Sequence, residues 1–189
     1  MTTLKFVPFA LVLLFAFGFG EAHALSYSPT TFTDPPVTGA GVSVNTTTGV
    51  ITGGAGNGLI SLRSASLGAN ANPGSTITLG AGTYQLTIAG DTNDRTWAGP
   101  TITDKFNPNI GDLDIYPGGT TINGAGATLT TIQQTTGADR VITVNPNATP
   151  GAAYTFTLSN LTMRGGRDTS NNHGGGGIFL GAKDNISII

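Results

Sequence analysis

The chain has 189 residues, no cysteine, and a formal net charge of −2 from eight basic and ten acidic residues. The missing cysteine excludes disulfide frameworks, cysteine-ligated zinc sites, iron–sulfur clusters and thiol nucleophiles, and the sparse charge provides no basic surface for nucleic acid or an anionic membrane. With 29 glycines and abundant β-branched threonine, the composition predicts one domain of many short strands joined by turns.

The first 24 residues have the three-part layout of a secretory signal peptide. Lys5 supplies a positive start, residues 6–19 are apolar, and an A-x-A cleavage pattern ends at Ala24. The apolar stretch is shorter than the roughly 20 residues that span a bilayer. We therefore expect cleavage between Ala24 and Leu25, a secreted or cell-surface location, and no transmembrane segment in the mature chain. Glu21, the only glutamate, would leave with the signal.

The mature chain begins with two different segments. Residues 25–58 are rich in Pro, Thr and Gly, which predicts an irregular leader with one edge strand at 41–44 or 49–52. Residues 59–70 contain no proline and predict one short amphipathic helix. Its helically spaced positions are Leu59, Leu62, Ser66 and Ala69.

From residue 72 the chain alternates short strands with turns. Ten runs are predicted as strands: 76–79, 83–88, 113–115, 120–122, 127–132, 141–144, 154–158, 161–163, 177–180 and 186–189. Such short strands suit either a β-sandwich or a β-solenoid. Spacing favours the solenoid, because Phe156 and Leu158 align with Ile186 and Ile188 at a step of 30 residues. Asn160 is either a stacked corner asparagine or a plain turn residue, and both interpretations stay open.

One long stretch resembles a known family. Residues 59–90 read LISLRSASLGANANPGSTITLGAGTYQLTIAG, followed by GDLDI, TTINGAGATLTTI, DRVITV and TLSNLTMRGG. This resembles the N-terminal part of secreted bacterial right-handed parallel β-helix proteins, of the CSLREA or polymorphic outer-membrane-protein-like type, with a pectin-lyase-like fold. The resemblance covers about residues 59–180. It implies an all-β fold in which a short helix at 59–70 caps the coils at 72–189.

Three positions depart from the family signature, and the end of the chain raises a further expectation. Ile60 stands where the signature has Cys, Ser64 where it has Glu, and Ser66 where it has Ile, which changes the packing of the cap and removes any cap disulfide. The last strand starts close to the final residue, so we expect a truncated β-helix. Its open end would need further coils or another chain.

The resemblance also implies an enzyme hypothesis, since the fold includes polysaccharide lyases that use an Arg base and Ca²⁺. Asp112 and Asp114 lie on one strand face about 7 Å apart, a spacing that suits Ca²⁺ or an acid–base pair. Arg164 is the candidate base. GDLDI also occurs in non-enzymatic members of the family as a solvent-facing turn into a strand. We favour that interpretation, and therefore expect no catalytic residue, cofactor or metal.

Other candidates have plainer explanations. Arg167, like Arg164, flanks a Gly-Gly turn and is expected to be a solvated corner residue, while Arg140 is expected to pair locally with Asp139. His173 lies five residues after Asp168, but no G-x-S-x-G elbow supports a catalytic triad.

Two further candidate sites lie in predicted loops. The glycines at 174–177 lack the Lys-Ser/Thr of a phosphate loop and indicate a corner. Trp97 lies in the insertion at 91–109 and is a candidate for stacking on a sugar, although packing within the loop is favoured.

Taken together, the sequence predicts a non-catalytic, secreted or surface-exposed β-helix scaffold. It would be adhesin-like or carbohydrate-contacting, with an extracellular polysaccharide or a host or cell surface as partner. The alternatives are a polysaccharide lyase or glycosidase, and a structural passenger domain of a larger surface protein.

Overall fold

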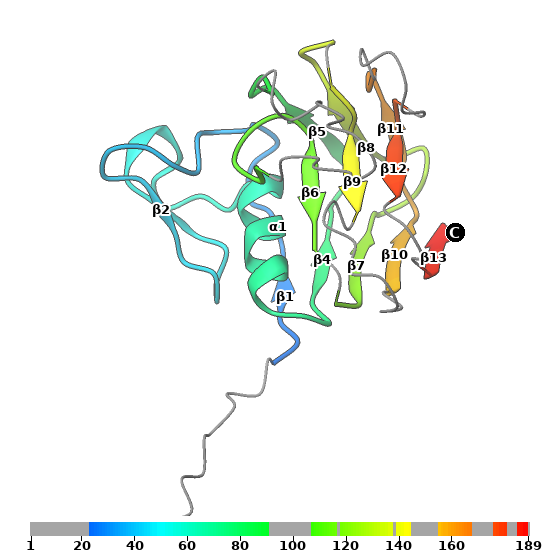
Figure 1. Cartoon of the computed structure of the whole chain (residues 1–189), viewed down its shortest axis with the longest axis horizontal. Coiled ribbons are helices and arrows are strands. Elements are labelled where there is room, and N and C mark those ends of the chain that lie inside the picture. Colours follow the sequence, from blue (N-terminus) through cyan, green and yellow to red (C-terminus); the bar gives the residue numbers. More distant parts are fainter. Residues whose placement is uncertain are drawn as a thin grey trace, which may run out of the picture.

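The computed structural model describes residues 23–90, 107–116, 118–137, 139–144, 155–167, 176–180 and 185–188. These residues form thirteen strands, one α-helix and one short 3₁₀ helix, with most strands in parallel sheets (Figure 1). The strand-rich fold class is therefore confirmed. Within this described part, no helix has the length and apolar character needed to cross a membrane.

Ten strands follow the helix, and each overlaps one of the ten predicted runs. They are β4 (Thr76–Thr78), β5 (Gly82–Leu86), β6 (Leu113–Ile115), β7 (Thr120–Asn123), β8 (Thr130–Gln134), β9 (Ile142–Val144), β10 (Thr155–Ser159), β11 (Thr162–Arg164), β12 (Ile178–Leu180) and β13 (Asn185–Ile188).

The largest difference from the predicted runs is at β8, which starts at Thr130 rather than at residue 127. The Gly126 carbonyl accepts hydrogen bonds from the N–H groups of Leu129 and Thr130, both at 2.9 Å, so the chain turns there. Leu129 is consequently 56% exposed. The alternation of residues 129–132 was correct only from Thr130 onward.

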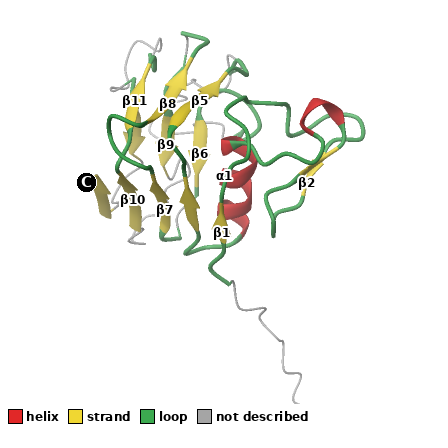
Figure 2. Ribbon diagram, turned by 180° about the vertical axis from the view of Figure 1, so that it is seen from behind, coloured by secondary structure: helices red, strands yellow, loops and turns green. Residues whose placement is uncertain are grey.

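Successive strands join three sheets in rotation. The five-stranded sheet has the order β1-β4-β7-β10-β13, and the two three-stranded sheets have the orders β11-β8-β5 and β12-β9-β6. From β4 to β13, each strand therefore pairs with the strand three positions away in the chain, and every such pair is parallel. Figure 2 shows β11, β8 and β5 side by side at the top of the view.

The register of these pairs stacks aliphatic residues on one another along one line inside the protein. Ile77, Ile122 and Leu158 occupy one register line of the five-stranded sheet, and each is at most 2% exposed. Phe156 pairs with Ile186, which confirms the predicted step of 30 residues. Because side chains alternate along a strand, the residues on either side of each buried one in the same strand point outward.

The helix α1 (Leu62–Ala71) begins later than the predicted start at residue 59. Ser61 is its N-cap: the Ser61 hydroxyl accepts from the Ser64 N–H at 3.1 Å, and the Ser64 hydroxyl accepts from the Ser61 N–H at 2.9 Å. Ser64 therefore completes a capping box with Ser61. Leu62 and Ala65 face the core.

The leader is more ordered than predicted. It contains β1 (Ser26–Tyr27), β2 (Ser43–Val44), β3 (Ile51–Thr52) and the 3₁₀ helix η1 (Gly54–Gly56). β2 and β3 pair antiparallel with each other, so both suggested edge positions are strands. β1 was missed because two residues carry no periodicity, and it forms the first strand of the five-stranded sheet.

Candidate functional site

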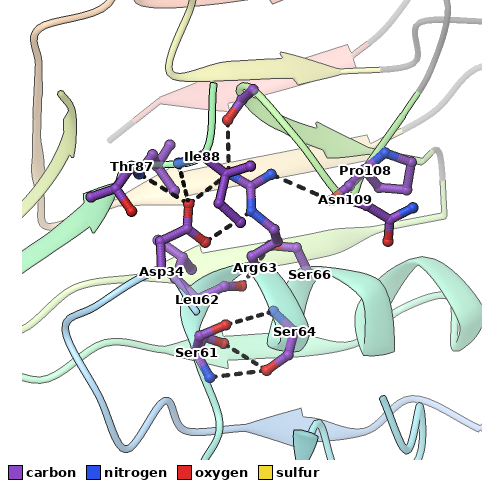
Figure 3. A network of polar contacts seen from close by, with 12 residues as sticks. Asp34, Ser61, Leu62, Arg63, Ser64, Ser66, Thr87, Ile88, Pro108 and Asn109 are labelled. Carbon is purple, nitrogen blue, oxygen red and sulfur yellow. Dashed lines mark hydrogen bonds and ion pairs between the residues drawn. The ribbon is translucent and has the colours of Figure 1, made fainter. Parts of the chain in front are cut away.

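The most extensive polar network of the described residues joins the leader, α1 and the start of the sheets (Figure 3). Arg63 is 1% exposed and forms a bidentate ion pair with Asp34, with Nε–Oδ1 and Nη2–Oδ2 distances of 2.9 Å. The same guanidinium donates to the carbonyl oxygens of Gly111 at 2.7 Å and Asp112 at 2.9 Å. Arg63 thus neutralises Asp34 and satisfies the backbone just before β6.

The Asp34 carboxylate extends this network to the end of β5. Its Oδ2 atom accepts hydrogen bonds from the N–H groups of Thr87 at 3.0 Å and Ile88 at 3.3 Å. Buried charges are tolerated when they are paired and hydrogen-bonded, and Asp34 satisfies both conditions. One leader residue therefore ties together α1 and β5.

The network is part of a cover over β4, β5 and β6, the first strands after the helix in the three parallel sheets. β1 pairs with β4 in the five-stranded sheet. The Phe32 carbonyl accepts the Gln85 N–H of β5 at 2.8 Å. The Asn70 side chain meets β6, since its Nδ2 donates to the Asp114 carbonyl and its Oδ1 accepts from the Tyr116 N–H, both at 2.8 Å. Asn70 thus imitates a paired strand, and the leader and helix occupy three edges that would otherwise template aggregation.

The predicted acidic pair is buried rather than solvent-facing, so that expectation was wrong. Asp112 and Asp114 are each 3% exposed. The Thr143 hydroxyl donates to Asp112 Oδ2, and the Asn107 N–H donates to Asp114 Oδ2 at 3.1 Å. β9 thus supplies a hydrogen-bond donor to Asp112, and the chain before β6 supplies one to Asp114, so both buried carboxylates are bonded within the protein.

Asp114, one of these two carboxylates, affects the neighbouring Tyr116. Burial and the negative charge of Asp114 both raise the pKa of Tyr116 above its ordinary value.

In the part of the chain that the structure describes, no group of three or more His, Asp or Glu side chains lies close enough together to hold a metal ion.

The predicted arginine base lies elsewhere. Arg164 ends β11, whereas Asp112 precedes β6, and these strands belong to different sheets. Arg164 is exposed, and its Nη2 donates to Gln133 Oε1 at 2.9 Å. Arg167 is also exposed, as expected of a corner residue, and its N–H donates to the Asp139 carbonyl at 2.7 Å.

Arg140 differs from its predicted role. Asp139 Oδ1 accepts the backbone N–H of Arg140 at 2.9 Å, so these residues do interact locally. The Arg140 guanidinium, however, lies 4.5 Å from the ring centroid of Phe179, in a cation–π contact. Arg140 therefore stabilises the contact between the segment before β9 and β12.

Asn160 is a turn residue, which is one of the two interpretations that its sequence left open. It is exposed and has a φ of 57°, the left-handed conformation that asparagine adopts in turns. Its Nδ2 also donates to Asn123 Oδ1 at 2.8 Å, linking β10 to β7 at the corner. It is a turn residue with a cross-strand hydrogen bond, and it does not point into the core.

Several predicted sites fall outside the described residues: Trp97, Asp168, His173, and the first two glycines of 174–177. The cleavage position does lie within them. Ala24 is exposed, whereas Leu25 is half-buried and donates its N–H to the Ser75 hydroxyl at 2.9 Å.

Sequence reasoning missed Asp34, Arg63 and Asn70 as the residues that hold the cover together. The available signal was the position of Arg63 beside Leu62 on the predicted apolar face of the helix. A buried arginine there requires an acid, and Asp34 is the leader's only acidic residue. Sequence alone did not indicate which backbone groups these side chains would meet.

Comparison of the chain with models of known protein families, with curated proteins and with solved structures found no match.

Proposed function

We propose that the chain is a right-handed parallel β-helix and that it acts as a secreted or surface-exposed scaffold, adhesin-like or carbohydrate-contacting. Support for the architecture comes from the rotation of β4–β13 through three parallel sheets. Support for the hand comes from general stereochemistry, because parallel strands joined by a crossover are right-handed in about 98% of cases.

The scaffold function is supported by the hydrogen bonds and ion pair that the buried charged groups form within the protein. Arg63 and Asp34 bind each other and the backbone, and Asp112 binds Thr143. An acid–base pair needs at least one carboxyl that can reach substrate. Asp112 and Asp114 are 97% buried, so they serve the fold in this arrangement.

Secretion completes the proposal. Residues 1–24 have the layout of a signal peptide. β1 starts at Ser26, so cleavage before Leu25 leaves all of its residues in the mature chain. The cysteine-free composition suits an oxidising exterior, because there is no thiol to oxidise.

The test uses the purified secreted protein on a panel of immobilised neutral and acidic polysaccharides and on whole cells. Saturable binding without product release is expected. Polygalacturonate is assayed in parallel, with and without Ca²⁺, by the absorbance of unsaturated products. Activity that disappears in Asp112→Ala/Asp114→Ala would overturn the scaffold proposal in favour of a lyase. Absence of both binding and activity would contradict the adhesin-like role and favour a structural passenger.

A further inference from the structure

The outer face of the five-stranded sheet has an unusual uniformity. Its outward positions on β1, β4, β7 and β10 alternate with the buried residues of the same strands. They are Ser26, Thr76, Thr78, Thr121, Asn123, Thr155, Thr157 and Ser159. Every one of these described side chains is short, uncharged and capable of hydrogen bonding.

These side chains form a grid because the strands are parallel and in register. Ser26, Thr76, Thr121 and Thr157 occupy one line across the sheet. Adjacent strands lie about 4.8 Å apart. Thr78, Asn123 and Ser159 form a second line two residues further along the strands, about 6.6 Å away. Figure 1 shows these strands side by side.

The first line is available to a ligand. Among the described residues, the hydroxyls of Ser26, Thr76, Thr121 and Thr157 have no hydrogen-bond partner in the protein. Threonine is β-branched, so its χ1 angle is restricted and its methyl and hydroxyl are held in place. In the second line, Ser159 donates to Asn123 Oδ1 at 2.8 Å, which fixes that row.

The other two outer faces lack this combination. The β11-β8-β5 sheet has a line of Thr83, Thr131 and Thr162, but its next line ends in the charged Arg164. On the β12-β9-β6 sheet, the corresponding line contains Asp114 and Thr143, and both are almost fully buried. Among the described outward positions, only the five-stranded sheet is both open and free of charge.

We propose that this outer face binds ice. A face without charge is complementary to a neutral surface, and a fixed grid of hydroxyls suits a partner with its own fixed grid. The inter-strand spacing is close to the oxygen repeat along the a axis of hexagonal ice. The hydroxyls complete hydrogen bonds at the crystal surface while the threonine methyl groups exclude mobile water. A neutral polysaccharide is disfavoured, because the described positions of this face offer no aromatic ring for stacking on a sugar.

The proposal is independent of whether the scaffold contacts carbohydrate elsewhere, and its test uses ice itself. The full chain is tagged with a fluorophore, and an ice crystal is grown slowly in a dilute solution of it. The fraction of protein incorporated is measured together with crystal shape and the gap between melting and freezing points. We expect incorporation into ice, faceted crystals and a measurable gap, because an ordinary protein is excluded from growing ice.

Two matched variants locate the activity. Thr121→Lys places a long charged side chain in the middle strand of the five-stranded sheet. Thr131→Lys does the same in the middle strand of the β11-β8-β5 sheet, where the threonine has the same half-buried exposure. Thr121→Lys should lose incorporation into ice, whereas Thr131→Lys should keep it, and circular dichroism melting curves of both should match the parent.

Three results would overturn the proposal. The parent protein could be excluded from ice, both variants could keep incorporation, or both could lose it while remaining folded. The same three proteins are also tested on cellulose and dextran beads. Binding to a polysaccharide that only Thr121→Lys abolishes, without binding to ice, would identify the occupant as a neutral glycan and contradict the ice proposal.

Discussion

Replacement of Arg63 by methionine should destabilise the protein severely. The substitution keeps much of the side-chain volume but leaves the Asp34 carboxylate buried without its counter-charge. It also removes donors from the carbonyls of Gly111 and Asp112. Breaking a buried, hydrogen-bonded ion pair typically costs 3–5 kcal/mol, so we expect about 4 kcal/mol.

Urea denaturation followed by circular dichroism measures this cost. With a denaturant slope of about 2 kcal/mol/M, a loss of about 4 kcal/mol lowers the midpoint by about 2 M. Arg164→Met is the matched control, because Arg164 is exposed and its side chain makes a single hydrogen bond among the described residues. Its free energy of unfolding should change by no more than about 0.5 kcal/mol. Arg63→Lys keeps the charge without the planar fork, and it supplies a folded variant of intermediate stability.

A double-mutant cycle isolates the pair itself. Asp34→Leu should cost as much stability as Arg63→Met. It leaves the guanidinium without its counter-charge and the N–H groups of Thr87 and Ile88 without their acceptor. Combining the two should cost less than the sum of the single changes by about 2–3 kcal/mol, since neither charge is then left alone. Strict additivity, or a midpoint for Arg63→Met equal to that of Arg164→Met, would refute the reasoning.

Three further predictions concern Tyr27, Asn160 and the cleavage position before Leu25. Burial raises the pKa of Tyr27 above 10.0, so the folded state holds a proton that the unfolded chain releases. The free energy of unfolding should be constant just below pH 10 and should fall as pH rises past 10 towards the folded pKa. Urea titrations at alkaline pH should show a smaller fall for Tyr27→Phe than for the parent. An equal fall in both proteins would contradict this prediction. Asn160→Ala should destabilise by about 1–2 kcal/mol in thermal melts, because alanine is strained at a φ of 57°. Asn160→Gly, which adopts that conformation freely, should cost less, and equal losses would refute the strain argument. N-terminal sequencing of the secreted protein should begin at Leu25, and a start within β1 would contradict the proposed cleavage.

The strands were predictable because their alternation is dictated by local geometry. In a short strand with one buried face, apolar residues recur at every second position, as in Thr76–Thr78 and Thr155–Ser159. The step from Phe156 to Ile186 was predictable because like residues stack between paired strands. Leu129 was wrongly predicted as a strand residue, because an apolar residue at a turn has the same sequence signature as one at the start of a strand.

The cover over the first strands was less predictable, because its bonds are long-range and involve side chains with backbone. Asp34 and Arg63 lie 29 residues apart, and Asn70 reaches Asp114 across 44 residues. No periodicity connects such positions. The burial of Asp112 and Asp114 was missed for the same reason, because polar residues become buried through partners that the local sequence does not specify.

Strands about 30–50 residues apart pair in parallel, in rotation through three sheets, and this pairing defines the fold. The absence of native cysteine makes disulfide trapping a direct test. Thr121 and Thr157 are register partners on adjacent parallel strands, which places their Cα atoms about 4.8 Å apart, within the range a disulfide spans. Thr121→Cys/Thr157→Cys should form an intramolecular disulfide upon mild oxidation, whereas Thr121→Cys/Thr162→Cys, on two different sheets, should not. Equal or reversed yields of the two crosslinks, measured by peptide mass spectrometry, would contradict the account.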